Sequence, residues 1–246
     1  MLVQEIWRYP VKSMAGESLD AADITEHGIA GDRIIQVRNA SGRIFTARTR
    51  PGLLRHRATL AEDGSVLVDG RPWNAAEVAR EVEDAAGGGT RLVRSNAEDR
   101  FDILPLLVTT DGMFAAVGHD RRRFRPNLVI GGVEGLSERQ WEGAQLRIGE
   151  VVIGMEDLRG RCIMTTFDPD TGAQDLGVLR RIQKEFGGVL GLNSYVVNPG
   201  RIAMGDQVEL IARPGIGSAM HCFSESTWVG TGSRAGWRPS RSITRG

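Results

Sequence analysis

The sequence predicts a β-rich α+β protein, and three observations lead to that class. Short runs that mix apolar and polar residues recur along the first two-thirds of the chain, separated by glycine, proline, asparagine or aspartate. Strands at such spacing are typical of a barrel or a sandwich. Two segments have helical character instead, and one of them shows the apolar period of an amphipathic helix. The length of 246 residues allows one large domain or two small ones.

The N-terminal strands are predicted from their turn residues. Residues 4–9 form the first expected strand, which Pro10 ends. Residues 34–38 and 43–48 flank Asn39-Ala40-Ser41-Gly42, which is the pattern of a hairpin with a four-residue loop. A further strand is expected at residues 66–68, between two Asp-Gly turns.

A glycine triplet follows the first predicted helix. Residues 77–85 form that helix, and Gly87-Gly88-Gly89 ends it. The triplet is a plausible domain junction. We therefore expect an N-terminal domain over residues 1–88 and a second domain over residues 89–212.

The second domain is predicted to hold further strands and one clear helix. The helix covers residues 176–186, with Leu176, Leu179, Ile182 and Phe186 on one stripe and Gly187-Gly188 as its stop. The expected strands are residues 103–109, 127–130, 145–148, 151–155, 163–167, 195–197 and 207–211.

Residues 213–246 differ from the rest in composition. They contain five arginines, one acidic residue and six glycines, with no clear periodicity. Such a segment is expected to be a flexible tail.

Composition excludes several classes of protein. The formal net charge is zero, which argues against a general nucleic-acid binder. No apolar run approaches the roughly 18–20 residues of a membrane helix, and the N-terminal segment lacks the pattern of a secretory signal. Two cysteines are too few for a disulfide framework. We expect a cytoplasmic protein without nucleic-acid or membrane partners.

The most informative segment surrounds Cys162. Arg159-Gly160-Arg161 precedes the cysteine, and Asp168-Pro169-Asp170-Thr171-Gly172 is a turn signal after it. Nearby positive charge favours the thiolate, the form that binds metals and attacks electrophiles. A buried, inert cysteine is the alternative interpretation of this segment alone.

Three further segments carry polar side chains next to turns. Lys12 and Ser13 follow Tyr9-Pro10 and could hold a phosphate, or form an exposed turn. Arg33 ends a glycine-bounded loop, where Asp32-Arg33 could be an ion pair or an anion clamp. Arg125 and Asn127 are expected on one side of an extended segment, facing a ligand or the solvent. The four histidines are scattered and no CxxC spacing occurs, so a classical zinc site is not expected.

These ordered segments together resemble the MOSC family, the domain found at the C-terminus of molybdenum-cofactor sulfurases. The resemblance spans roughly residues 1–212 and points to the subgroup that contains the mitochondrial amidoxime-reducing component. The motifs that carry it are Tyr9-Pro10-Val11-Lys12-Ser13, Gly31-Asp32-Arg33, Thr46-Ala47-Arg48, Phe124-Arg125-Pro126-Asn127, Trp141-Glu142-Gly143, residues 161–172 and Asn198-Pro199-Gly200.

The resemblance implies an N-terminal β-barrel-like domain packed on a MOSC β-barrel with a few short helices, and a molybdenum–molybdopterin cofactor between the two parts. It implies Cys162 as the catalytic residue and the protein's ligand to the metal. The expected cofactor-binding residues are Lys12, Ser13 and Arg33 at the phosphate end, with Arg48 as a further candidate, and Arg125, Asn127 and Arg161 on the other side. Residues 110–123 depart from the family pattern, so no substrate contact is carried over there.

The leading hypothesis from the resemblance is an oxidoreductase that reduces N-oxygenated compounds such as amidoximes. Some bacterial relatives append a ferredoxin-like domain and this chain has none, so electrons are expected from a separate ferredoxin- or cytochrome-type protein. A second hypothesis is a sulfur carrier or cofactor-handling protein, in which Cys162 holds a persulfide received from a pyridoxal-phosphate-dependent cysteine desulfurase. A third is a non-catalytic ligand-binding β-barrel with an unreactive thiol.

Overall fold

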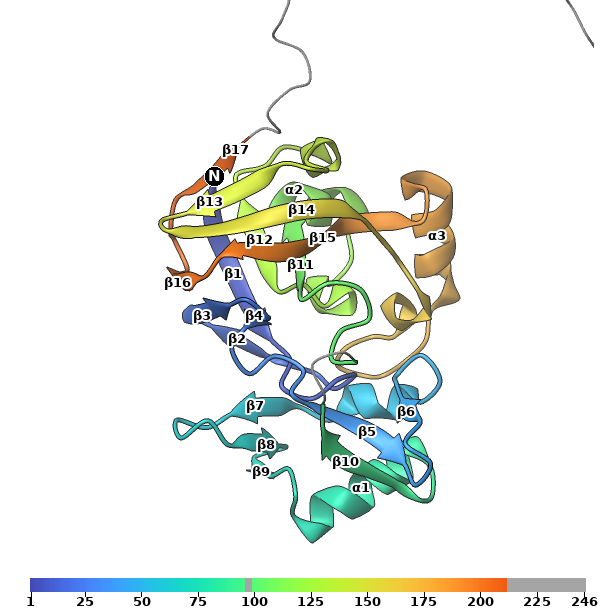
Figure 1. The fold of residues 1–246 in the computed structure, drawn as a ribbon. Helices are drawn as coiled ribbons and strands as arrows, with labels where there is room; N and C mark the ends of the chain where they lie inside the picture. The colour runs from blue at the N-terminus through green and yellow to red at the C-terminus, as the bar shows by residue number, and fades with distance from the viewer. Residues whose placement is uncertain (96–98, 212–246) are drawn as a thin grey trace, which may run out of the picture. The chain divides into compact units, whose positions relative to one another are not determined.

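The protein is described here by a computed structural model that covers residues 1–95 and 99–211. Its largest element is an eight-stranded sheet with the order β17-β13-β14-β15-β11-β12-β1-β2 (Figure 1). The strands of this sheet are β1 (Leu2–Arg8), β2 (Glu17–Leu19), β11 (Leu106–Thr110), β12 (Leu128–Gly131), β13 (Gln145–Ile148), β14 (Val151–Gly160), β15 (Val189–Asn198) and β17 (Val208–Ile211). The sheet is mixed, because β11 and β12 run parallel and their neighbours run antiparallel.

The two longest strands lead the chain towards the site. β14 and β15 have ten residues each and pair antiparallel, from Val152 opposite Asn198 to Gly160 opposite Val189. Side chains such as Ile6, Leu128, Leu146 and Ile153 point into one buried cluster beneath the sheet. From β14 the cluster takes Val151, Ile153 and Met155, with Leu158 packed against it, and the chain continues beyond the strand to Cys162.

Three smaller sheets complete the strand-rich part of the chain, in the orders β10-β5-β6, β16-β3-β4 and β7-β8-β9. Their strands are β3 (Ala21–Thr25), β4 (Gly28–Ile29), β5 (Ile35–Asn39), β6 (Ile44–Phe45), β7 (Ala58–Leu60), β8 (Val66–Val68), β9 (Arg71–Pro72), β10 (Thr90–Arg94) and β16 (Gly200–Ala203). Helix α1 (Ala76–Ala86) and the 3₁₀ helix η1 (Pro51–Arg55) pack with β5 and β8 around a second buried cluster that includes Val37, Leu53, Val68 and Val82.

Two helices cover a third apolar cluster. α2 (Asp111–Val117) begins at Thr110, whose hydroxyl accepts a hydrogen bond from the Met113 amide at 3.0 Å. α3 (Leu176–Phe186) ends at Gly187, which has φ of +67° as a left-handed cap requires. Three short 3₁₀ helices lie between these elements: η2 (Arg121–Phe124), η3 (Ser137–Gln140) and η4 (Ile163–Thr166).

The structure confirms the β-rich class and several predicted elements. The helix over 176–186 has the predicted bounds, and the helix predicted at 77–85 is α1. The predicted hairpin is β5–β6, in which Val37 lies opposite Phe45. The strand expected from residue 103 begins only at Leu106, since Pro105 has no N–H to donate to a ladder.

Three predicted local conformations are wrong. Residues 163–167 form the 3₁₀ helix η4 and not a strand, because the hydroxyls of Thr165 and Thr166 donate to carbonyls three residues back and tighten the turn. The predicted apolar stripe of α3 is wrong at Leu176, which is 43% exposed at the start of the helix. The buried residues of α3 are Val178, Ile182 and Phe186. Arg125 has φ of +55°, so the segment from it to Asn127 is not extended and its alternation does not apply.

The described residues belong to one compact unit within Met1–Arg213. The predicted division into residues 1–88 and 89–212 stays a prediction. The segment 213–246, expected to be a tail, lies outside the described residues. Among the described residues, no helix is long and apolar enough to cross a membrane.

Candidate functional site

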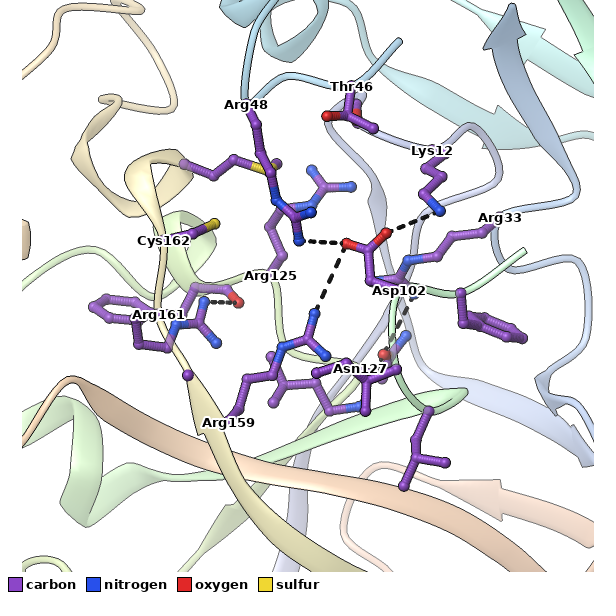
Figure 2. Close-up of a pocket in the computed structure, with 18 of the residues that line it drawn as sticks. Lys12, Arg33, Thr46, Arg48, Asp102, Arg125, Asn127, Arg159, Arg161 and Cys162 are labelled. Carbon is purple, nitrogen blue, oxygen red and sulfur yellow. Dashed lines mark hydrogen bonds and ion pairs between the residues drawn. The ribbon is translucent and has the colours of Figure 1, made fainter. Parts of the chain in front are cut away.

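A cavity of about 180 Å³ opens at the C-terminal end of β14 (Figure 2). Its walls come from segments far apart in the sequence: the turn after β1, the loops before β5 and after β6, residues 101–107, residues 123–127 and residues 159–164. All eight residues that the sequence indicated line this cavity: Lys12, Ser13, Arg33, Arg48, Arg125, Asn127, Arg161 and Cys162.

Cys162 is held in place by its backbone. It lies two residues beyond β14, with extended dihedral angles (φ −127°, ψ −179°), and caps η4. Its carbonyl oxygen accepts hydrogen bonds from the Thr165 amide at 3.1 Å and the Thr165 hydroxyl at 2.9 Å. The preceding amide, of Arg161, donates to the Gly188 carbonyl at 2.9 Å. The partly exposed thiol is thus fixed at the cavity wall.

Two arginines beside Cys162 are partly buried. The guanidinium of Arg125 lies 4.2 Å from the centroid of the Tyr9 ring and donates to the Met14 carbonyl at 2.6 Å. Arg161 donates to the Phe124 carbonyl at 2.7 Å, and its Nε is buried without a hydrogen-bond partner. Burial lowers the pKa of both arginines, yet both stay charged near neutral pH. Desolvated cations of this kind favour an anionic ligand.

Backbone strain is concentrated at the cavity. Among the described residues, four that are not glycine have positive φ: Ser13 (73°), Arg33 (53°), Asp69 (50°) and Arg125 (55°). Three of the four line the cavity. The left-handed region costs about 1–2 kcal/mol per residue, and such strain clusters at functional sites. The strain therefore supports the prediction that these residues are placed for a ligand.

Some predicted site residues also serve the fold. The Ser13 hydroxyl accepts a hydrogen bond from the Ala47 amide at 3.0 Å, which leaves its O–H as a donor. Asn127 is 1% exposed; its Oδ1 accepts from the Leu107 amide at 3.1 Å and its Nδ2 donates to the Trp7 carbonyl at 3.2 Å. Its amide is thus committed mainly to holding strands together.

Arg33 is paired behind the cavity with a fully buried acid. Asp32 is 0% exposed, forms an ion pair with Arg33 and accepts from the Tyr9 amide at 2.7 Å. The two interpretations of Asp32-Arg33 are therefore compatible, because the pair holds an arginine that also lines the cavity.

Sequence reasoning missed an acid at the centre of the site. Asp102 lies 2.9 Å from Lys12 Nζ, 2.8 Å from Arg48 Nη2 and 3.9 Å from Arg159 Nη2 (Figure 2). Burial alone would raise the pKa of Asp102, but the hydrogen bond and charge of Lys12, with the charges of Arg48 and Arg159, lower it further than burial raises it. The carboxylate is therefore ionised at neutral pH.

Arg159 was also missed as a site residue, although a signal for it existed. It precedes Arg161 by two positions at the end of β14, and the two-residue period of a strand places such residues on one side. Arg159 lines the cavity and donates to Asn193 Oδ1 at 2.9 Å. Asp102 had no comparable signal, because nothing around it in the sequence marks a motif.

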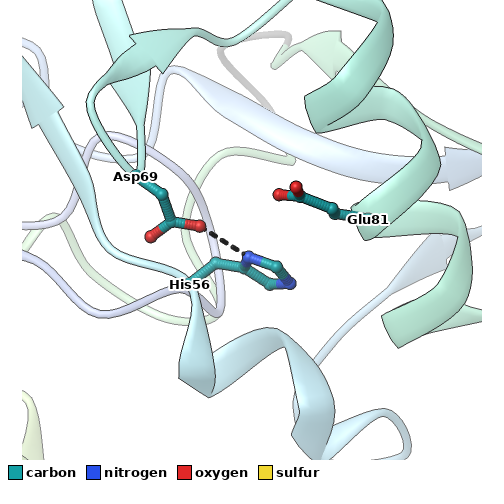
Figure 3. A group of neighbouring side chains, drawn as sticks. All are labelled: His56, Asp69 and Glu81. Atoms are coloured by element: carbon teal, nitrogen blue, oxygen red, sulfur yellow. Dashed lines mark hydrogen bonds and ion pairs between the residues drawn. The ribbon is translucent and has the colours of Figure 1, made fainter.

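A second group of potential metal ligands lies elsewhere in the described chain. His56, Asp69 and Glu81 offer ligand atoms within 4.8 Å of one another (Figure 3). Asp69 already bonds to His56 Nδ1 at 2.8 Å, and Glu81 is paired with Arg71 at 2.9 Å. The first pair joins the end of η1 to the β8–β9 turn and the second joins α1 to β9, and we assign no ion to this group.

The donor set of the cavity fits an anion with a soft-leaning metal. Seven cationic side chains line it against one acid, Asp102; the cations are Lys12, Arg33, Arg48, Arg123, Arg125, Arg159 and Arg161. Lysine and arginine bind phosphate, and a cysteine thiolate is a ligand for softer metals. The orphaned Nε of Arg161 beside Cys162 is one further donor available to a bound group. The site is that of a β-rich protein with a cation-lined cavity beside a cysteine, suited to an anionic ligand.

Comparison with known families agrees with this class. The MOSC N-terminal beta barrel domain matches residues 1–102, and the MOSC domain matches residues 113–209. The chain belongs to the MOSC-domain family, with both domains in this order.

Individual relatives share a modest fraction of their residues with this chain. The human mitochondrial amidoxime-reducing component 1 is 27% identical, over 86% of this chain and 83% of its own length. The molybdenum cofactor sulfurase 2 of Culex quinquefasciatus is 36% identical, over 30% of this chain and 10% of its own length. Among solved structures, the YUAD protein from Bacillus subtilis aligns with 86% of this chain and 95% of its own, at 14% identity and a TM-score of 0.44.

Proposed function

We propose that this protein binds a molybdenum–molybdopterin cofactor in the cavity beside Cys162 and reduces N-oxygenated compounds with electrons from a separate protein. MOSC membership and the amidoxime-reducing relatives support a function associated with the molybdenum cofactor. The single observation that carries the proposal is the convergence of Cys162 and seven cations on one cavity, three of whose lining residues are held in a strained conformation.

Each part of the cavity has a task in this proposal. Lys12, Arg33 and Arg48, with the free O–H of Ser13, hold the phosphate end of the cofactor. Arg125, Asn127 and Arg161 line the other side, where the two partly buried arginines bring positive charge. Asp102, now bonded to Lys12 and Arg48, must yield at least part of that contact to the phosphate. Cys162 supplies the thiolate ligand, and its fixed backbone orients the metal.

The reaction in this proposal is the cleavage of an N–O bond. The substrate N–OH group takes up two electrons and two protons, and the products are the N–H compound and water. The bound cofactor supplies the two-electron redox chemistry. The protein orients the substrate and keeps the cations around Cys162 desolvated, which strengthens their electrostatic effect. A ferredoxin- or cytochrome-type protein returns the electrons.

The test of the cofactor compares two cysteine variants. Wild type, Cys162→Ala and Cys222→Ala are expressed in a host that makes the cofactor, and molybdenum and pterin are measured in the purified proteins. Cys222→Ala removes the chain's other cysteine and serves as the matched control. We expect near-stoichiometric molybdenum in wild type and Cys222→Ala, and its loss in Cys162→Ala. Absence of both molybdenum and pterin from all three would overturn the proposal.

The test of the reaction uses the molybdenum-loaded protein. Benzamidoxime is offered with a chemical electron donor, and benzamidine is measured. Formation of benzamidine by wild type but not by Cys162→Ala supports the reductase. If loaded protein leaves benzamidoxime and other N-hydroxylated bases untouched, the reductase activity is excluded while cofactor binding stands.

The partial similarity to a molybdenum cofactor sulfurase favours a second candidate function. In it, Cys162 carries a persulfide received from a pyridoxal-phosphate-dependent cysteine desulfurase. After incubation with a desulfurase and cysteine, cyanolysable sulfur on Cys222→Ala but not on Cys162→Ala would favour the sulfur carrier. The names of the amidoxime-reducing relatives place those proteins in mitochondria. The cytoplasmic location expected for this chain is therefore kept as a proposal.

A further inference from the structure

A second cavity adjoins the one that holds Cys162. It has a volume of about 400 Å³ and shares Arg123, Arg125 and Met164 with the first cavity. Met164 stands two residues after Cys162, so the second cavity begins close to the proposed metal ligand. Its volume falls in the range of roughly 300–1,000 Å³ that is usual for small-molecule sites.

Aromatic side chains form one wall of the second cavity. Trp7, Tyr9 and Phe167 line it, and the last two are 3% and 9% exposed. The backbone at Gly16 comes close to this wall: a Cβ there would lie 2.5 Å from the Tyr9 ring and 2.2 Å from the Arg8 carbonyl oxygen. No other residue fits at Gly16 without displacing the ring. The wall suits a flat, apolar group.

The rim of the second cavity carries two arginines whose charge is not compensated by an acidic side chain in the described part of the chain. Among its five arginines, Arg122 is paired with Asp170 at 2.7 Å and Arg123 with Asp168 at 2.8 Å. The side chains of Arg55 and Arg57 have no hydrogen-bond or ion-pair partner within the described residues, and both are exposed. Arg55 lies along the 168–172 loop, since a Cβ at Gly172 would lie 3.7 Å from its Cγ and Cδ.

We propose that the second cavity binds the non-reacting part of the substrate, and that this part is an aromatic ring bearing a carboxylate. The aromatic wall takes the ring, and Arg55 and Arg57 at the rim take the carboxylate, for which the guanidinium fork is suited. Arg123, Arg125 and Met164 line both cavities, so a molecule that occupies both would pass these three side chains to reach Cys162. The substrate role rests on the proposed reductase function, whereas the binding of an aryl carboxylate does not.

The test compares a carboxylated and a neutral substrate of the same shape. Loaded wild type receives 4-carboxybenzamidoxime and benzamidoxime, and kcat/KM is measured for each. The test variant is Arg55→Gln/Arg57→Gln. The control is Arg80→Gln/Arg91→Gln, which removes the same charge from exposed arginines that line neither cavity.

We expect wild type and the control to prefer the carboxylated substrate by about tenfold, chiefly through KM, as two exposed ion pairs allow. The ratio should fall towards one in the test variant and decrease with added salt. Equal kcat/KM for both substrates in wild type, or a ratio unaffected by Arg55→Gln/Arg57→Gln, would overturn this inference while leaving the reductase intact.

A binding measurement separates the two proposals if neither substrate is reduced. Calorimetry on the loaded protein then compares 4-carboxybenzamidoxime with benzamidoxime. Tighter binding of the carboxylated compound that the test variant loses and the control keeps supports the site although the reductase fails. Equal dissociation constants for the two compounds exclude the site.

Discussion

Asp102 Oδ1 lies 2.9 Å from Nζ of Lys12, among the seven cations that line the cavity. The other oxygen of the same carboxylate lies 2.8 Å from Arg48 Nη2. The acid therefore occupies part of the position that a phosphate would take, and it competes with an anion for the same two cations. Asp102 therefore offsets the charge of two of the seven cations that line the cavity.

Replacing Asp102 is expected to lower the stability of the fold and to raise its affinity for an anion. Asp102→Asn keeps the shape of the side chain but leaves Lys12 and Arg48 without their counter-charge. We expect the free energy of unfolding to fall by about 1–2 kcal/mol in phosphate-free buffer. Inorganic phosphate should then raise the melting temperature of Asp102→Asn more than that of wild type. An equal shift in both proteins would show that Asp102 does not compete with the anion.

Asp102 also predicts behaviour at acid pH. Its pKa in the folded protein is lowered, as described above, so the folded state holds the carboxylate charged more strongly than the unfolded chain does. The ion pairs therefore stabilise the fold above the unfolded pKa of about 3.9, and this contribution is lost as pH falls through the lower, folded pKa. Denaturant unfolding of wild type should lose stability on acidification more steeply than Asp102→Asn. Parallel pH profiles would contradict the role of the pair.

Glu138 predicts the opposite pH dependence. It is 0% exposed, its Oε1 has no hydrogen-bond partner, and burial raises its pKa, while its own backbone amide, Thr110 and Arg139 lower it less. A raised folded pKa adds stability below the unfolded value of about 4.3, and this stability is lost as pH rises through the folded pKa. At neutral pH the buried carboxylate is therefore destabilising.

Glu138→Gln is expected to unfold at a higher denaturant concentration than wild type at pH 7–8, by about 1 kcal/mol. The difference should shrink as pH falls towards the unfolded value of about 4.3 and vanish below it, as the buried carboxyl takes up a proton. The control is Glu134→Gln, which changes an exposed carboxylate four residues earlier. If Glu138→Gln is less stable than wild type at neutral pH, the carboxylate has a structural role that an amide cannot fill.

Motifs next to turns were predictable from the sequence, and contacts between distant segments were not. Lys12, Arg33 and Cys162 each follow a recognisable strand end or loop, but their convergence was implied only by the family that the ordered motifs resemble. Asp102 meets Arg48 across 54 positions, and no local pattern encodes that pairing. The error at residues 163–167 has another origin, because threonine favours strands in general but here its hydroxyls close a turn.

Asn127 shows how a residue found through a motif can serve the fold before it serves a ligand. Its side chain accepts from the Leu107 amide at 3.1 Å and donates to the Trp7 carbonyl at 3.2 Å and to Asp32 at 3.3 Å. These bonds join β1, β11 and the loop before β5. Asn127→Ala leaves the Leu107 amide and the Trp7 carbonyl unpaired in the interior, and we expect it to lower the free energy of unfolding by about 2–4 kcal/mol.

Asn127→Asp should be worse near neutral pH, because it sets a second carboxylate against the buried Asp32, and acid should partly restore it. The control is Asn198→Ala, which removes an exposed amide that donates to the Glu150 carbonyl at 2.6 Å. Chemical denaturation of the cofactor-free proteins checks all three variants. If Asn127→Ala unfolds like Asn198→Ala yet loses its cofactor, Asn127 acts on the ligand and the structural role argued here is wrong.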